Sequence, residues 1–317
     1  MTDGEKREIA PWRGWLIAGI VTTVCLILGM NMLDLSQSAR ELAQISAQAW
    51  FVVIGLSLAM ALLRAARVAI VARVAQLGPV IKASFQHGAA NAVLPGRLGE
   101  AVLPLALSRY SGLDPVRAVG LLLIVRLGDL IVLIGLGFVF VAAIDLWNHS
   151  AAVRSALVLG GLALIAGVSF VPAMVGQIGS WTPKTLRALA GRLARAGSAL
   201  TGNTRLGLLV VTLAIWLVLG VAAHVSISAS GLEIGLGYAF LAAIAASLAF
   251  ALPTNGIASA GPFEAAFVGI LTLSGASAEL ALAAAIHLHL CALIAALLAA
   301  LSTLLFPAYW GDKPLCP

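Results

Sequence analysis

Residues 117–143 read RAVGLLLIVRLGDLIVLIGLGFVFVAA, an apolar run whose interior carries only two charges, Arg126 and Asp129. A helix needs about 20 predominantly apolar residues to cross the roughly 30 Å hydrocarbon core of a bilayer, because each residue adds about 1.5 Å. This stretch is long enough to do so. It decides the fold class, because the rest of the chain repeats its character.

Five further stretches reach the same length, so we expect about six spanning helices, at roughly 13–33, 45–63, 117–143, 153–175, 206–230 and 279–306. The composition agrees: 61% of the 317 residues are hydrophobic and 10% are charged, with a mean hydropathy of +1.05. Soluble domains are roughly 45–50% apolar and about 25% charged. We therefore predict an all-α polytopic membrane protein, with residues 1–317 as one membrane domain, and exclude a soluble enzyme or a disulfide-rich scaffold.

The basic residues gather in two connecting segments, 64–97 and 176–205, neither of which contains an acidic residue. Loops rich in Lys and Arg face the cytoplasm in membrane proteins. We therefore expect both segments, and both termini, on the cytoplasmic side of a bacterial inner membrane. The net charge of +6 is a topology signal on this interpretation and does not predict binding to nucleic acid.

Two other apolar stretches, 84–110 and 236–275, are broken in the middle by helix-breaking residues. The first break contains Pro95, Gly96 and Gly99, and the second contains Gly261 and Pro262. Counting crossings between the expected cytoplasmic and outer segments leaves neither stretch as a full span. We predict two re-entrant hairpins, the first entering from the cytoplasmic side and the second from outside.

The two broken segments also align with each other. Glu100 precedes Gly112 by 12 residues and Glu264 precedes Gly275 by 11, and 14 further residues lead to Arg126 and to His289, respectively. Each half then consists of two helices, a hairpin and a helix, and the halves start on opposite sides. This predicts an inverted repeat, about 13–143 and 153–306, as found in secondary transporters.

Charged residues at membrane depth are expensive and by default mark function. Arg97 and Glu100 lie in the first hairpin, and Arg126 and Asp129 share one face of the next helix, three residues apart. Two interpretations stay open. The residues form ion pairs that fix the hairpin to the helix, or the two arginines clamp an anionic head group, with the carboxylates as their partners in the empty state.

Three polar residues accompany this cluster. Asn91 precedes the first break and is placed either to cap the interrupted backbone or to join the site. Glu264 follows the second break, near a helix start, where capping and a part in head-group or proton handling are both open. His289 aligns with Arg126. His287 lies about 200° from it on a helix, so we expect no metal site and no cofactor.

The run Asn91 to Glu100 (NAVLPGRLGE), followed by Arg126 and Asp129, resembles the signature of the transmembrane flippase-like domain of lysylphosphatidylglycerol synthases, the multiple peptide resistance factor family. The stretch 261–264 (GPFE) resembles that family's second signature, and the similarity covers most of 10–306. The resemblance implies movement of phospholipids or related amphiphiles between leaflets. Stand-alone members include a hopanoid-biosynthesis-associated group of about this length.

The chain departs from the family pattern at two places. The family often has a basic residue shortly after the Gly-Glu pair, where this chain has Leu103 and Pro104, and often has arginine where this chain has His289. Both changes remove positive charge, which leaves room for a nearly neutral lipid such as a hopanoid. The aminoacyl-transfer domain of the synthases has no counterpart in this sequence.

We therefore expect a lipid transporter with no catalytic chemistry, whose partners are membrane lipids. Two alternatives remain open. One is a scaffold that recruits lipid-biosynthesis enzymes through its basic surfaces, and the other is a membrane lipid-head-group transferase that uses Glu100 or Asp129. Self-association into a homo-oligomer is also left open by the sequence.

Overall fold

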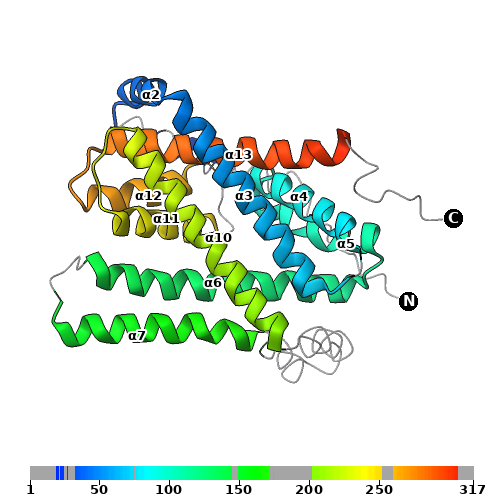
Figure 1. Cartoon of the computed structure of the whole chain (residues 1–317). Coiled ribbons are helices and arrows are strands. Elements are labelled where there is room, and N and C mark those ends of the chain that lie inside the picture. Colours follow the sequence, from blue (N-terminus) through cyan, green and yellow to red (C-terminus); the bar gives the residue numbers. More distant parts are fainter. Residues whose placement is uncertain are drawn as a thin grey trace, which may run out of the picture.

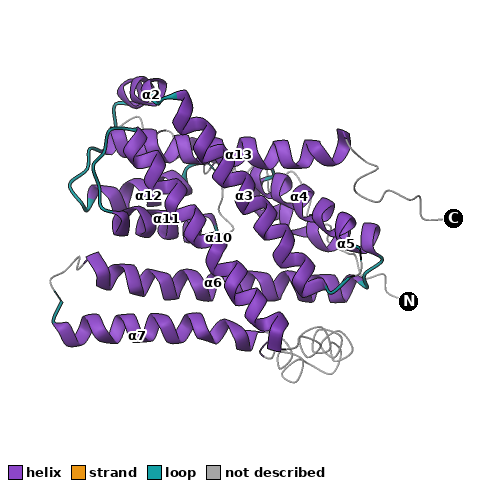
Figure 2. Ribbon diagram, viewed as in Figure 1, coloured by secondary structure: helices purple, strands orange, loops and turns teal. Residues whose placement is uncertain are grey.

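The structure is a computed structural model that describes residues 33–74, 76–144, 149–171, 202–251 and 260–305, with residues 19, 20, 22–24, 27 and 174; for residues 95–97 it describes the backbone alone. Within these ranges the regular elements are all helices (Figure 2). The prediction of an all-α polytopic membrane fold is confirmed.

Five helices are long and apolar enough to cross a membrane: α3 (Ala47–Ala72), α6 (Pro115–Ile144), α7 (Ala151–Gly167) with the short 3₁₀ helix η2 (Val168–Phe170), α10 (Gly202–Ala229) and α13 (Ala278–Leu305). They correspond to five of the six predicted spans. Most of the sixth, 13–33, lies outside the described residues. In Figure 1, α3, α7 and α13 run in one direction, while α6 and α10 run in the other.

The first of these helices corrects one prediction. The span expected at 45–63 continues to Ala72, so Arg64 and Arg67 lie inside α3 and not in a basic cytoplasmic connection. The sequence beyond residue 63 is rich in Ala and Val, which lets the helix continue past its first charges. The helix ends at Arg73, which adopts a left-handed backbone conformation (φ 50°) and donates its N–H to the Ala69 carbonyl.

The first predicted hairpin consists of α4 (Leu77–Val93), the 3₁₀ helix η1 (Pro95–Ala101) and α5 (Val102–Ser111). Pro95 lacks an N–H and disfavours helical geometry in the residue before it, and Leu94 is accordingly extended (φ −78°, ψ 135°). With 17 and 10 residues, α4 and α5 are each shorter than the roughly 20 residues of a full span.

The second hairpin consists of α11 (Leu236–Phe250) and α12 (Pro262–Thr272), which are apolar but too short to span. Gly261 starts α12 with a φ of 107°, a conformation that favours glycine, and Pro262 occupies the first helical turn. Figure 1 shows α4 and α5 toward one end of the long helices and α11 and α12 toward the other. The side of the membrane that each hairpin enters stays a prediction.

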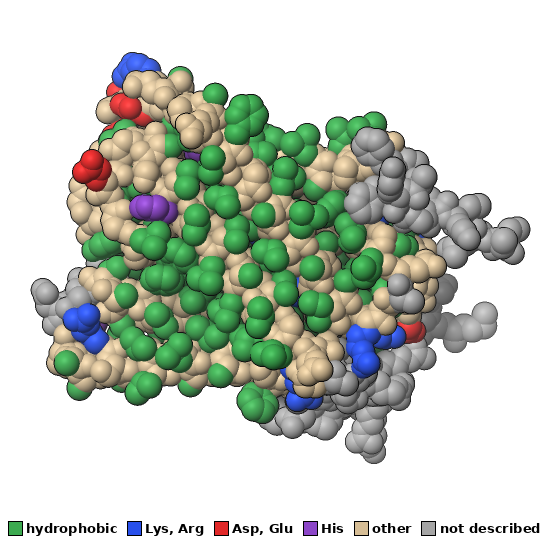
Figure 3. Space-filling view, in the orientation of Figure 1, with side chains coloured by type: hydrophobic (Ala, Val, Ile, Leu, Met, Phe, Trp, Pro, Cys, Tyr) green, Lys and Arg blue, Asp and Glu red, His purple; other side chains and the backbone are tan. Residues whose placement is uncertain are grey.

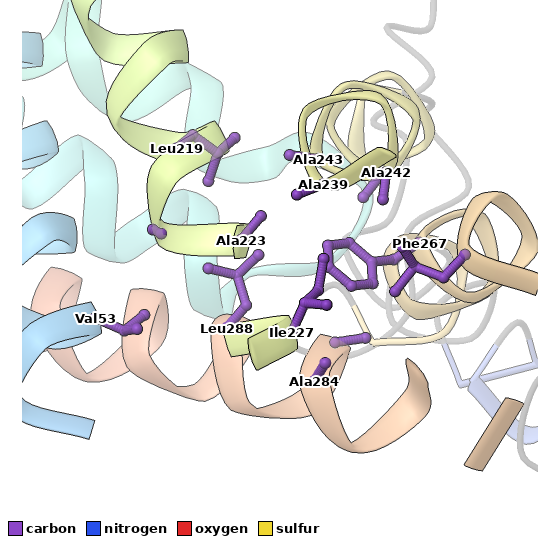
Figure 4. Close-up of a cluster of buried hydrophobic side chains, with 14 of the residues drawn as sticks. Val53, Leu219, Ala223, Ile227, Ala239, Ala242, Ala243, Phe267, Ala284 and Leu288 are labelled. Atoms are coloured by element: carbon purple, nitrogen blue, oxygen red, sulfur yellow. The ribbon is translucent and has the colours of Figure 1, made fainter. Parts of the chain in front are cut away.

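A cluster of buried side chains holds the second hairpin against the spanning helices. In Figure 4, Phe267 of α12 lies beside Ile227 of α10 and next to small residues of α11. Four buried alanines form one helical face of α11: Ala239, Ala242, Ala243 and Ala246. Small residues let helices approach closely, which is the main way that helices associate within lipid.

The spanning helices α6 and α7 pack closely against each other through two glycines. A Cβ atom added to Gly135 would lie 2.7 Å from the Gly161 carbonyl oxygen, and one added to Gly161 would lie 2.5 Å from that of Gly135. Toward the outside, large apolar side chains cover the long helices. On the face in Figure 3, charged side chains gather at the two ends of these helices. This distribution suits a protein surrounded by lipid.

Candidate functional site

The charged residues of the first half meet around the middle of α6. Asp129 is the fifteenth of the 30 residues in this helix, and Arg126 lies one turn earlier. Helices α3 and α10 pack against α6, and the hairpin reaches Arg126 through His87 of α4 and Glu100 of η1. The site is therefore built by spanning helices on one side and a helix break on the other.

Asp129 forms a buried, two-pronged ion pair with Arg67 of α3. The Arg67 Nη1 atom donates to Asp129 Oδ1 at 2.5 Å, and Nη2 donates to Oδ2 at 3.1 Å. The Trp216 indole donates to Oδ1 at 3.1 Å, and Arg67 Nη1 lies 3.3 Å from the Thr212 hydroxyl. This pair joins α3, α6 and α10 at one point.

The predicted pairing of Asp129 with Arg126 is present, but Arg67 is the closer partner of this carboxylate. The expectation rested on their separation of three residues along one helix. The Arg126 Nη1 atom does lie within ion-pair range of Asp129 Oδ2, but at 3.7 Å. The shorter, two-pronged contact from α3 satisfies the carboxylate better, and only the crossing of α3 and α6 brings it there.

The principal partner of Arg126 is Glu100, on the 3₁₀ helix of the hairpin. Arg126 Nε donates to Glu100 Oε2 at 2.9 Å, and Nη2 lies 2.5 Å from Oε1. The side chain of Arg126 is 32% exposed, against 3% for Arg67. The two ion pairs therefore differ: one is sealed within the bundle, and the other is accessible.

His87 and Asn91, one turn apart on α4, support the accessible pair. The amide of Asn91 donates to Glu100 Oε1 at 3.3 Å and lies 3.2 Å from His87 Nε2. His87 Nε2 also faces Arg126 Nη2 at 3.3 Å, and its Nδ1 lies 3.1 Å from the Gly99 carbonyl oxygen. A carbonyl can only accept and a guanidinium can only donate, so His87 carries its proton on Nδ1 and is neutral.

Glycine is required at position 99 by this close packing. A Cβ atom there would lie 2.4 Å from Asn91 Oδ1, 2.5 Å from the Asn91 backbone nitrogen and 2.6 Å from the Ala90 carbonyl carbon. The absent side chain lets η1 fold back onto α4 and brings Glu100 within reach of Asn91. The backbones of Pro95 and Gly96 form the start of this turn.

The side chain of Arg97 lies outside the described part of the structure, so its predicted place in a clamp stays a prediction. Glu100, which was expected to neutralise Arg97, is held by Arg126 and Asn91. Asn91 thus contacts the site carboxylate, whereas the alternative interpretation made it a cap of the broken backbone.

The second half contains a counterpart of the accessible pair. His289 of α13 lies 2.5 Å, through its Nδ1, from Oε1 of Glu264, the third residue of α12. Glu264 Oε2 also accepts the Gly261 N–H at 2.7 Å, so it caps the helix and contacts His289 at once. In both halves, a glutamate just after the break pairs with a basic residue 25 or 26 positions later.

Histidines 287 and 289 have separate surroundings. His287 is fully buried, where its Nδ1 lies 3.1 Å from the Ser226 hydroxyl and its ring contacts Trp50 edge-on. His289 contacts Glu264 and Phe263. Among the described residues no group of three or more His, Cys, Asp or Glu side chains is placed to hold a metal ion.

Sequence reasoning missed two basic side chains of this site, Arg67 and His87, and the polar residues Thr212 and Trp216. Arg64 and Arg67 were assigned to a loop because the predicted span was ended at its first charge. Their separation of three residues within an Ala- and Val-rich run was the available signal, since it places both on one helix face.

Comparison with known proteins supplies a family. A family model described as "Lysylphosphatidylglycerol synthase TM region" matches residues 15–300. No curated protein and no solved structure matches the chain. The matched range includes both hairpins and both glutamate pairs.

Proposed function

The chain belongs to the lysylphosphatidylglycerol synthase transmembrane family, and we propose from this membership and from the site that it moves an amphiphilic lipid between the leaflets of a bacterial inner membrane. The proposal includes no covalent chemistry. A phospholipid and a hopanoid-type lipid are both compatible with the membership alone.

The observation that carries the proposal is the contrast between the two ion pairs of the first half. The Arg67–Asp129 pair is sealed and additionally bound by Trp216, which suits a structural lock. Arg126 and Glu100 are at the same level of α6 but partly exposed, beside the break of a hairpin. An accessible ion pair inside a membrane protein is typical of a substrate pathway.

In this mechanism a lipid head group takes the place of Glu100 on the Arg126 guanidinium. After the exchange Glu100 still accepts a hydrogen bond from the amide of Asn91, so its carboxylate keeps a donor. Arg126 is paired before, during and after the exchange, and the lipid tail stays in the bilayer. The polar head thereby avoids the cost of entering hydrocarbon without partners.

The proposed orientation rests on charges at the two ends of the helices. Arg73 ends α3, and Arg117 and Arg205 lie in the first turns of α6 and α10, all at one end of the bundle (Figure 1). Glu233 follows α10 and Glu279 begins α13 at the opposite end. By the positive-inside rule, the arginine-rich end faces the cytoplasm.

The test is lipid movement in vesicles that contain the purified protein, with leaflet-resolved detection of fluorescent lipids. Arg126→Lys keeps a positive charge but loses the planar fork that matches a head-group anion. We expect normal folding and loss of most lipid movement. Arg40→Lys, on the exposed surface of α2 (Leu35–Gln44), is the matched control and should move lipid at the wild-type rate. Movement no faster than in protein-free vesicles, for the folded wild type, would refute the proposal.

A further inference from the structure

The pair of His289 and Glu264 in the second half differs from its counterpart in one chemical respect. A guanidinium such as that of Arg126 stays protonated in proteins, whereas an imidazole gains or loses a proton near neutral pH. His289 Nδ1 lies 2.5 Å from Glu264 Oε1. The basic member of the second pair can therefore change its charge, and the basic member of the first cannot.

His289 lies at membrane depth and not at the surface. It is the twelfth of the 28 residues of α13, as Arg126 is the twelfth of the 30 residues of α6. About 17 Å of helix therefore precedes each of them. The two helices run in opposite directions, so these depths are measured from opposite ends (Figure 1). Ionisable residues at such a depth mark substrate paths or proton relays.

Proton exchange at His289 leaves the carboxylate beside it with a donor. Glu264 Oε2 accepts the Gly261 N–H at 2.7 Å at the start of α12, where the helix dipole favours a negative charge. Glu264 is therefore stabilised even when His289 is neutral. An ionised carboxylate can only accept, so His289 Nδ1 carries a proton in both states, and the exchanging proton binds at Nε2.

The Nε2 atom of His289 is accessible to a proton. The side chains of His289 and Glu264 are 17% and 14% exposed. Among the described residues, His289 Nε2 has no hydrogen-bond partner and is not one of the sealed polar atoms, whereas His287 Nε2 is sealed without a partner. Of these two neighbouring histidines, only His289 is placed to exchange a proton.

No second charged group of the described structure contacts this pair. Helices α2, α3, α4, α10 and α11 also pack against α12 or α13. The ionisable residues of these helices and of α13, none of them within ion-pair distance of the pair, are Arg40, Glu41, Arg64, Arg67, Lys82, His87, Arg205, His224, Tyr238, Glu279, His287 and Cys291. The charge of the pair is therefore set by its own two members.

From these observations we propose that His289 is a proton-binding site, and that an anionic lipid head group crosses the membrane together with one proton bound there. Uptake forms an N–H bond at Nε2 with a proton from water on one side, and release breaks this bond and returns the proton to water on the other. The protonated pair is neutral and lets the anion pass, whereas the deprotonated pair carries the charge of Glu264 and repels it. This inference rests on the proposed function and supplies its energy source.

The test imposes a pH difference across vesicles that contain the purified protein, with the membrane potential held at zero by valinomycin and equal potassium on both sides. Fluorescent phosphatidylglycerol is the probe. One pH unit is a factor of ten in proton concentration, so one proton per lipid should enrich the probe in the leaflet on the alkaline side by up to about tenfold. Without the pH difference, we expect no enrichment.

Three variants assign the response to His289. His289→Arg keeps a cation beside Glu264 but cannot release a proton, so it should reach the same leaflet ratio with and without the pH difference. His289→Gln should also lose the response. His224→Gln is the matched control, because His224 lies on spanning helix α10 and forms no ion pair among the described residues, and it should respond as wild type. Thermal unfolding in detergent checks that each variant is folded.

Proton binding is measured separately from lipid movement. The side-chain nitrogen signals of isotope-labelled histidine are followed by nuclear magnetic resonance in detergent from about pH 5 to about pH 8, the range in which imidazoles change charge. We expect a signal that shifts with pH in wild type and in His224→Gln, and that is missing from His289→Gln.

The outcomes separate the proton site from the proposed function. A wild type that moves the probe but ignores the pH difference, or enriches it on the acidic side, would overturn the coupling. A wild-type response in His289→Arg, or a His289 signal that is constant with pH, would show that His289 is not the site. A His289 signal that shifts with pH, in a protein that moves no lipid, would leave the proton site standing and refute the proposed function.

Discussion

Removing Asp129 should destabilise the protein more than removing either arginine near it. In Asp129→Ala, Arg67 stays 3% exposed, and among the described residues the Thr212 hydroxyl is its one remaining hydrogen-bond partner. Leaving one charge of a buried pair without its partner costs about 3–5 kcal/mol. The Trp216 indole also loses its acceptor, for which about 1–3 kcal/mol is typical. Asp129→Asn keeps an oxygen for Trp216 and should be the milder change.

Arg67→Met should lower the free energy of unfolding less than Asp129→Ala does. In this variant Asp129 keeps its hydrogen bond from the Trp216 indole, and the Arg126 Nη1 atom, 3.7 Å away, can still pair with it. The double variant has no bare buried charge and should be more stable than Asp129→Ala. Thermal and denaturant unfolding in detergent, followed by circular dichroism, gives the free energies of unfolding of wild type, the two single variants and the double variant. These four values form a double-mutant cycle. Losses that add within about 0.5 kcal/mol would show that Arg67 and Asp129 are not coupled, and the reasoning would fail.

Two further predictions use glycines with matched neighbours. Gly99→Ala places a methyl group against the backbone of α4, so it should lower the free energy of unfolding by about 1–3 kcal/mol. It should also displace Glu100 and thereby slow lipid movement. The control Gly88→Ala has nothing within 4 Å, so it should leave lipid movement unchanged and stability unchanged or slightly higher. In Gly161→Ala the new methyl group would clash with the Gly135 carbonyl oxygen, so this variant should lose a similar amount of thermal stability. Gly160→Ala points into open space and should not lose stability. Equal melting temperatures for Gly161→Ala and Gly160→Ala would contradict the close packing of α6 against α7.

The sequence predicts the parts of this fold that depend on local composition. Apolar runs of about 20 residues or more located the five described spanning helices, because the thickness of the bilayer sets a minimum length that composition reveals. Pro95 and Gly261 located the two breaks for an equally local reason, since one lacks an N–H and the other adopts a positive φ. The alignment of His289 with Arg126 followed from equal spacing in the two halves, and the structure places each of them beside the glutamate of its own half.

The composition of the charged site could not be predicted in the same way. Arg67 reaches Asp129 across 62 positions of sequence, and Trp216 reaches it across 87, so both contacts depend on how α3, α6 and α10 cross. His87 carries no motif, and its contribution comes from the fold of η1 back onto α4. Local spacing identifies which residues share a face, but it does not identify which face a neighbouring helix presents.

The two glutamate pairs are alike in geometry and unlike in charge. Arg126 is permanently charged, so the pair in the first half always contains a cation that a head-group anion can share. His289 holds its charge only while protonated, and Glu264 is in addition fixed to the Gly261 N–H as a helix cap. The permanently charged member of the two glutamate pairs therefore lies in the first half. On the proposed function, a lipid phosphate has its stronger partner in the Arg126–Glu100 pair, beside the break of the first hairpin. If the end of the bundle that carries the first hairpin faces the cytoplasm, as the arginines at the helix ends indicate, the same proposal predicts tighter binding of anionic head groups from the cytoplasmic leaflet than from the outer one.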